Sequence, residues 1–170
     1  MTLTPHPDTA AIALHCAVIT VSDTRTRDTD RSGQLIRLLL QDAGHHIMAH
    51  SLVRDEPVLI QTELEQLSQQ AELDAVIVNG GTGIAPRDTT YDAIATLLEK
   101  TLPGFGELFR WLSYQEIGSR AIASRAIAGV FRQKLVFSVP GSVGAVTLAM
   151  QTLILPELRH LVTQMRTESH

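Results

Sequence analysis

Short apolar runs rich in valine and isoleucine alternate along the chain with longer segments whose apolar residues recur every three or four positions. The runs predict β-strands, and the unbroken apolar centre of the first run is typical of a parallel strand buried on both faces. Strands are expected at 15–22, 47–53, 74–78, 130–131 and 135–139.

The segments between these runs have the periodicity of amphipathic helices. Gly44 suits a helix C-terminus, Pro57 suits a first turn, and Asp30 or Ser32 is expected to cap the first helix. Helices are expected between the cap and Gly44 and at 57–70, 89–98, 107–117, 143–153 and 155–165, with a break at 103–106 and a separation near Pro156. The Ala/Ile-rich segment 121–128 fits neither pattern. Strands alternating with helices predict an α/β protein with a mainly parallel sheet covered on both faces.

The length of 170 residues suits one domain, which we expect at 15–165 between polar tails at 1–14 and 166–170. Aromatic residues make up only 4% of the chain, so the core must consist mostly of Ala, Val, Ile and Leu. No apolar run has transmembrane length, and the N-terminus lacks the pattern of a signal peptide. We therefore expect a cytoplasmic protein without a membrane partner.

The single cysteine, Cys16, excludes an internal disulfide bond. It lies within an apolar run, which predicts a buried strand residue rather than a nucleophile. The net charge of −4 argues against a broad electrostatic interface for nucleic acid. It leaves room for a small anionic ligand, because a few backbone amides, one arginine or a metal ion can bind phosphate locally.

A glycine-rich loop, 80–83, directly follows the strand at 74–78 and precedes a helix. Such a loop either makes a plain tight turn or binds an anion through its backbone N–H groups, aided by the helix dipole. It has neither the Gly-Lys-Ser/Thr of a Walker A loop nor the Gly-x-Gly-x-x-Gly of a dinucleotide fingerprint. A second small-residue turn, 140–142, follows the strand at 135–139 and is expected at the same edge of the sheet.

Two carboxylates, Asp55 and Asp88, are expected at this edge, each close to the start of a helix. Either one alone is most simply a helix cap. Together, beside a phosphate-binding loop, they supply the oxygen ligands that Mg²⁺ prefers. Asp23, after the first strand, is either a third polar group at this edge or, more simply, a residue of the polar loop that follows. The seven histidines show no recurring metal-ligand spacing.

The helix at 107–117 holds Trp111 and most of the other aromatic residues. Such a cluster is either part of the core or a contact between subunits.

Several short motifs, in this order, resemble the MoaB/MogA family of molybdenum cofactor biosynthesis, which includes the molybdopterin-binding domains of gephyrin-like proteins. The resemblance covers about 15–162, and the segment 109–118 is more similar to the MoaB branch. The motifs are Val21-Ser22-Asp23, Gly80-Gly81-Thr82-Gly83, Pro86-Arg87-Asp88, Pro103-Gly104-Phe105-Gly106-Glu107, Ser124-Arg125-Ala126-Ile127-Ala128-Gly129 and Pro140-Gly141-Ser142.

This resemblance implies a three-layer α/β/α sandwich of the molybdopterin-binding type that assembles as a homotrimer or homohexamer. It also implies a molybdopterin adenylyltransferase, which transfers AMP from Mg-ATP to molybdopterin and releases pyrophosphate. The implied catalytic and magnesium-binding residues are Asp55 and Asp88. The implied substrate-binding residues are Gly80, Gly81, Thr82, Gly83, Ser113, Ser124, Pro140, Gly141 and Ser142.

Two other functions remain open from the sequence. One is a non-catalytic protein that binds molybdopterin or a nucleotide and assists cofactor assembly. The other is an unrelated nucleotide-binding α/β protein, supported by the glycine loop alone. The chain also has Arg54 where the family often has an apolar residue or proline before the acidic position.

Overall fold

The computed structural model describes residues 11–167, so most of the predicted N-terminal tail and residues 168–170 of the predicted C-terminal tail lie outside the described residues. A six-stranded sheet has the order β2-β1-β3-β6-β5-β4. The strands are β1 (His15–Val21), β2 (His46–Val53), β3 (Ala75–Asn79), β4 (Lys100–Thr101), β5 (Ile127–Phe131) and β6 (Lys134–Val139). β2, β1, β3 and β6 are parallel, whereas β5 and β4 are antiparallel additions. The mainly parallel sheet is therefore confirmed.

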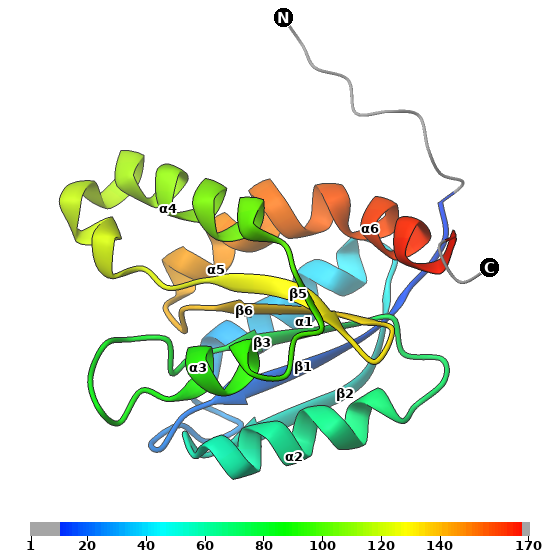
Figure 1. The fold of residues 1–170 in the computed structure, drawn as a ribbon, viewed down its shortest axis with the longest axis horizontal. Coiled ribbons are helices and arrows are strands. Elements are labelled where there is room, and N and C mark those ends of the chain that lie inside the picture. Colours follow the sequence, from blue (N-terminus) through cyan, green and yellow to red (C-terminus); the bar gives the residue numbers. More distant parts are fainter. Residues whose placement is uncertain (1–10, 168–170) are drawn as a thin grey trace, which may run out of the picture.

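Helices cover both faces of the sheet, with α2 and α3 on one side and α4 and α6 on the other (Figure 1). The helical elements are α1 (Arg31–Asp42), α2 (Pro57–Ser68), α3 (Thr90–Ala95), α4 (Pro103–Ile117), the 3₁₀-helix η1 (Gly118–Ala123), α5 (Val143–Ala149), the π-helix η2 (Met150–Ile154) and α6 (Leu155–Thr167).

Alternate residues of each central strand enter two separate apolar clusters. In β1, Cys16 and Val18 pack on the side of α1, α5 and α6, whereas Ala17 and Ile19 pack on the side of α2 and α3. Successive side chains of a strand point to opposite faces, so a continuous apolar run fills both. The predicted three-layer α/β/α sandwich is confirmed.

The predicted break at 103–106 is wrong, because these residues form the first turn of α4. Pro103 occupies the first helical position, where its missing N–H costs nothing and its fixed φ suits a helix. Gly106 is buried against the segment just before β5, and a Cβ there would lie 2.6 Å from the Ala126 carbonyl oxygen. The Pro-Gly segment thus begins a helix that passes closely over the backbone before β5.

The predicted separation near Pro156 is replaced by one continuous helical run from Val143 to Thr167. The π-helix η2 occurs just before the proline, and the Leu155 N–H donates to the Met150 carbonyl, five residues back. Proline has no N–H to donate, so the regular hydrogen-bond ladder must change at this point. The helix accommodates Pro156 by this local widening and does not end.

Strand order determines where a ligand can enter. After β1 the chain moves to β2 on one side, and β3 then returns to the other side of β1. Connections that leave neighbouring parallel strands in opposite directions open a crevice beyond their carboxyl ends. None of the helices in residues 11–167 has the length and apolar character needed to cross a membrane.

Candidate functional site

A pocket of about 510 Å³ lies beyond the carboxyl ends of β1, β3 and β6, at the predicted edge of the sheet. It brings together most of the predicted site residues, from five separate segments of the chain. Those that line it are Asp55, Gly80, Gly81, Thr82, Gly83, Asp88, Ser124, Pro140 and Gly141. Asp23, Arg25, Arg87 and Arg120 also line it.

Two of the predicted residues do not line this pocket. Ser113 is buried within α4, with 4% of its surface exposed. Ser142 is the N-cap of α5, and its Oγ accepts a hydrogen bond from the Ala145 N–H at 3.2 Å. The hydroxyl of Ser142 therefore has a local structural role.

The two glycine turns are in direct contact, which explains why both need glycine. Gly80 has φ +102°, and a Cβ there would lie 2.2 Å from the Val21 carbonyl oxygen. A Cβ on Gly141 would lie 3.0 Å from the Gly80 Cα. Positive φ and such close backbone approach are accessible to glycine at little cost. The two turns and the end of β1 thereby form one surface of the pocket.

Four consecutive backbone N–H groups of the loop, those of Gly81, Thr82, Gly83 and Ile84, donate none of the hydrogen bonds found within residues 11–167. The carbonyl of Gly81, in contrast, accepts from the Thr90 N–H at 3.0 Å. Successive amides without a protein acceptor, next to a helix N-terminus, are the usual means of binding an anion through the backbone. The loop thus has donors available for phosphate.

Asp55 is buried, with 5% of its surface exposed, and it connects the end of β2 to α3. Its Oδ1 accepts from the Thr89 N–H at 3.1 Å, the Thr89 hydroxyl at 2.7 Å and the Thr90 hydroxyl at 3.3 Å. Of the two residues expected near the cap of α2, Asp55 and Glu56, it is Glu56 that holds the N-cap position. Asp55 instead supplies the acceptor at the start of α3.

The second oxygen of Asp55 lies beside the glycine loop. A Cβ built on Gly81, which has φ +65°, would lie 2.4 Å from Asp55 Oδ2. The same Cβ would lie 2.0 Å from the Thr90 hydroxyl oxygen. Gly81 therefore lets the loop pass over the carboxylate, and any larger side chain would displace it.

Asp88 is partly exposed and folds back over the same loop. A Cβ on Gly83 would lie 2.6 Å from Asp88 Oδ2. Thr89, not Asp88, holds the N-cap position of α3, and the Asp88 N–H donates to the Ala85 carbonyl at 2.9 Å. The carboxylate of Asp88 is therefore not used as the cap of α3 and lines the pocket.

Two arginines in the pocket are held by partners far away in the sequence. Arg87 forms a two-pronged pair with Asp23, with Nε–Oδ2 at 2.7 Å and Nη2–Oδ1 at 2.9 Å. The hydrogen bond from Arg87 is the main cause that lowers the pKa of Asp23. Arg25 donates to the Ser32 hydroxyl at 2.7 Å and to the Gly141 carbonyl at 2.9 Å.

Sequence reasoning did not identify Arg25, because it lies in a polar loop and its partner Gly141 is 116 residues away. Asn79 was missed as well, although it ends β3 directly before the glycine loop. It accepts from the Ser32 hydroxyl at 2.7 Å and donates to the Thr20 hydroxyl at 3.0 Å. The available signal was a polar residue, Asn79, at the end of an otherwise apolar strand, and in the structure it is fully buried.

A second pocket of about 540 Å³ lies on the other side of the loop and shares Gly83 and Asp88 with the first. Its further lining includes Gln61 from α2, Asp92 from α3, and Arg125. The segment 83–88 thus separates two cavities, and Asp88 borders both.

The donors present fit a magnesium ion that arrives with phosphate and do not form a complete metal cage. Within residues 11–167 no three His, Cys, Asp or Glu side chains gather to hold a metal. Asp55 and Asp88 line one pocket, and one or two carboxylates plus substrate phosphate oxygens are the usual ligands of Mg²⁺. Cys16 is no nucleophile here, because burial raises the pKa of its thiol to about 12.

Fold and pocket together define an α/β protein with a pocket at the carboxyl ends of a parallel sheet. The sequence profile of a family described as a probable molybdopterin binding domain matches residues 17–160, and the chain belongs to that family. The predicted resemblance to MoaB and MogA proteins is therefore confirmed.

Relatives of the MoaB branch match over almost their whole length. Molybdenum cofactor biosynthesis protein B of Bacillus subtilis (strain 168) is 53% identical over 169 residues, which cover 99% of each chain. A crystal structure of a molybdenum cofactor biosynthesis protein B is 48% identical with a TM-score of 0.91, covering 94% of this chain and 100% of the other. A MogA structure is 26% identical with a TM-score of 0.80, covering 89% and 99%. The higher identity to protein B supports the predicted MoaB branch.

Proposed function

We propose that the protein acts in molybdenum cofactor biosynthesis as a molybdopterin adenylyltransferase that uses Mg-ATP. The observation that carries this proposal is the pocket in which two carboxylates meet three residues, 81–83, whose backbone N–H groups donate no hydrogen bond within residues 11–167. The free amides suit a polyphosphate, and the carboxylates suit the magnesium ion that accompanies ATP. Family membership and the names of the MoaB relatives support molybdopterin as the second substrate.

The main obstacle to this reaction is the repulsion between two polyanions that must be brought together. The N–H groups of 81–83 would bind and orient the phosphates of ATP, and the cationic Arg25 and Arg87 would reduce the local negative charge. Mg²⁺ held between Asp55, Asp88 and the phosphates would neutralise charge on the transferred group. Because Asp55 is fixed by α3, its free oxygen needs no reorganisation to serve as ligand.

The reaction itself needs no protein nucleophile. An oxygen of the molybdopterin phosphate would attack the α-phosphorus of ATP, the bond from this phosphorus to the bridging oxygen would break, and pyrophosphate would leave. Ser124, which lines the pocket, is the proposed contact to molybdopterin, with Pro140 and Gly141 as the neighbouring surface. Ser113 and Ser142 are outside the proposed site, since the first is buried in α4 and the second caps α5.

The test is to incubate the purified protein with molybdopterin, ATP and Mg²⁺ and to measure adenylylated pterin and pyrophosphate. We expect both products with the wild type, none after chelation of Mg²⁺, and at least a roughly hundredfold lower turnover for Asp88→Asn. The exposed Asp28, which does not line the pocket, gives the matched control Asp28→Asn, expected to keep full activity. No product at high concentration of folded wild type would refute the proposal.

A second candidate is a non-catalytic protein that binds molybdopterin or a nucleotide and assists cofactor assembly. The observation favouring it is that Asp55 already accepts three hydrogen bonds from the start of α3 through Oδ1. This candidate predicts binding of molybdopterin with no pyrophosphate formed. Failure to bind molybdopterin at all would instead favour an unrelated nucleotide-binding protein.

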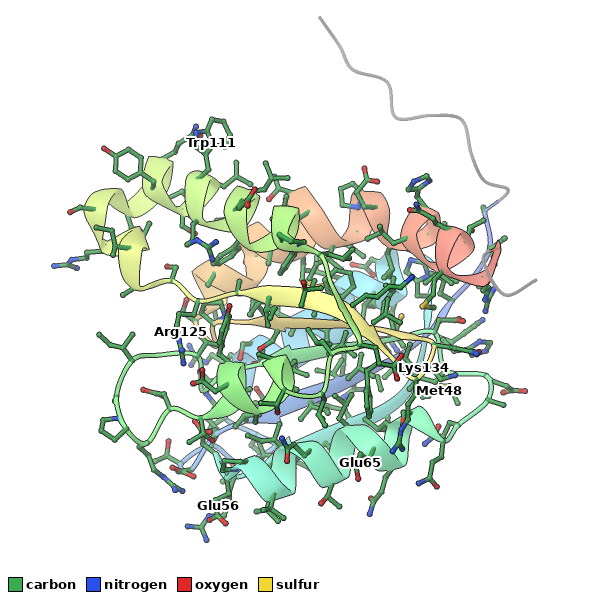
Figure 2. The ribbon with its side chains drawn as sticks, viewed as in Figure 1. Met48, Glu56, Glu65, Trp111, Arg125 and Lys134 are labelled. Atoms are coloured by element: carbon green, nitrogen blue, oxygen red, sulfur yellow. The ribbon has the colours of Figure 1, made fainter. Side chains whose placement is uncertain are left out.

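We also propose a cytoplasmic homotrimer or homohexamer with neither nucleic acid nor membrane as a partner. Apolar side chains exposed along α4 support self-association, and Trp111 points outward from this helix, away from the sheet (Figure 2). The net charge of −4 supports the absence of a nucleic-acid interface.

A further inference from the structure

Arg125 connects the glycine loop to α3 through all three nitrogens of its guanidinium. Its Nε donates to the Thr82 carbonyl and its Nη2 donates to the Gly83 carbonyl, both at 3.1 Å. The two Nη atoms also form a two-pronged pair with Asp92, at 3.2 and 2.9 Å. The cation stacks over the Tyr91 ring at 4.5 Å, and the side chain is 27% exposed. Figure 2 shows Arg125 beside the start of β5, level with α3.

These contacts determine which way the loop amides face. All peptide bonds of the described residues are trans, so the carbonyl of one residue and the N–H of the next point in opposite directions. Drawing the Thr82 and Gly83 carbonyls toward Arg125 therefore directs the Gly83 and Ile84 N–H groups away from it. Arg125 lines the second pocket and not the first. Gly83 lines both pockets, whereas Ile84 lines only the second, so the Gly83 N–H is the one that turns from the side of Arg125 toward the first pocket.

We propose that Arg125 is a positioning residue that holds the backbone of the glycine loop so that the Gly83 N–H faces the phosphate of a bound polyphosphate. This inference rests on the proposed function only in that the first pocket binds phosphate. Arg125 has no other visible task at the site, since four of its five N–H donors are occupied by the loop and Asp92. A planar fork is needed for this set of acceptors, and lysine cannot replace it.

The experiment compares the wild type, Arg125→Lys and Asp92→Asn. Arg125→Lys keeps the charge and removes the fork, while Asp92→Asn weakens the anchoring of the fork to α3 without a change in the first pocket. Arg132→Lys is the matched control, because Arg132 is an exposed arginine that stacks on Phe131 and lines neither pocket. For each protein we would measure the Kd of inorganic pyrophosphate and of ATP by calorimetry, the melting temperature, and the ¹H–¹⁵N amide shifts of the ligand-free protein.

We expect Arg125→Lys to raise both Kd values at least about tenfold, the scale of one hydrogen bond to an anion. Asp92→Asn should change Kd in the same direction by a smaller factor, and Arg132→Lys should leave it unchanged. The Gly83 and Ile84 amide signals should move in Arg125→Lys before any ligand is added, which a general loss of stability would not produce selectively. A KM increase for ATP larger than the decrease in kcat should accompany this in the adenylylation assay.

Unchanged Kd values in Arg125→Lys, or loop amide signals at their wild-type positions, would overturn the inference while leaving adenylyltransferase activity intact. A wild type that binds neither pyrophosphate nor ATP would overturn it as well. Absence of adenylylated product, with pyrophosphate binding that depends on Arg125, would refute the proposed function alone. Should Arg125→Lys fail to fold, unchanged amide signals and unchanged Kd values in Asp92→Asn decide against the inference.

Discussion

At the scale of single residues, His45 shows how a buried group makes stability depend on pH. Its Nδ1 accepts the Leu14 N–H at 3.1 Å, which requires the neutral imidazole with its proton on Nε2. Burial is the main cause that lowers the pKa of His45 below its ordinary value of 6.5, and the charges of Arg159 and His46 act in the same direction while Asp74 opposes them. The folded protein therefore resists protonation at this position.

Because the pKa of His45 is lowered by folding, the unfolded chain takes up this proton first as the pH falls. The stability that depends on neutral His45 is complete above pH 6.5 and declines as the pH decreases through this value. The slope is at most about 1.4 kcal/mol per pH unit for one proton. Urea unfolding at pH 7.5 and 5.5 should show this decrease in the wild type and a smaller one in His45→Gln. An equal decrease in His45→Gln and in the exposed control His160→Gln would contradict it.

The candidate site could be predicted at this scale as a set of residue types, but their partners could not. Asp55 was expected at the pocket edge, and the structure places it there together with the glycine loop. Its hydrogen bonds to Thr89 and Thr90 join positions 34 and 35 residues apart, which no local pattern contains. Asp55 accepts hydrogen bonds from the start of α3 and not from α2 because both helices pack against the same face of the sheet. The pairing of Arg25 with Gly141 was unpredictable for the same reason.

At the scale of elements, α4 has an apolar side that the other residues of the described range 11–167 leave exposed. Leu108, Trp111, Tyr114 and Ile117 are each more than half exposed and recur at helical spacing, and Ile122 in η1 adds to them. Buried Phe105 and Phe109 pack the opposite side of the helix into the core. The aromatic cluster predicted at 107–117 is thus divided, since its phenylalanine belongs to the core and its tryptophan and tyrosine do not.

We expect Trp111→Glu to weaken self-association because a charge in an apolar contact must lose its hydration. Light scattering coupled to size exclusion should give a mass of several times 18.6 kDa for the wild type and a smaller mass for the variant. The matched control is Leu38→Glu on α1, where the side chain is 54% exposed outside this cluster. A monomeric wild type, or an unchanged mass in Trp111→Glu, would exclude α4 as the contact.

Element positions were predictable where one pattern dominated and not where two competed. The apolar runs of β1, β3 and β6 identified three central strands, because burial on both faces needs a continuous run. β4 has two exposed residues and no apolar pattern, so it exists only through its pairing with β5. Pro103 and Pro156 were interpreted as breaks, yet proline is also compatible with a first turn and with a π-bulge.

At the scale of the whole molecule, the two ends of the parallel strands have different roles. The carboxyl ends carry the pocket with Asp55 and Asp88. The opposite ends carry an ionic cluster around the buried Asp74, which accepts from the His15 N–H at 2.8 Å and pairs with the exposed Arg166. Close by, Lys134 donates to the Leu73 carbonyl at 2.7 Å. Figure 2 shows Arg125 and Lys134 at opposite ends of the sheet.

This separation predicts that stability and activity can be impaired independently. Asp74→Ala leaves the His15 N–H without its acceptor and Lys134 without a nearby anion, which should cost about 2 kcal/mol in the free energy of unfolding. Turnover of the fraction that remains folded should stay unchanged, because no side chain of the cluster lines the pocket. Glu72→Ala, the same loss of charge at an exposed neighbour, should cost less than about 0.5 kcal/mol.

Asp88→Asn should show the reverse behaviour, with lost turnover at nearly unchanged stability, as measured by urea unfolding and product formation on the same samples. A loss of turnover in Asp74→Ala at temperatures where it is fully folded would show that the two ends of the sheet are coupled.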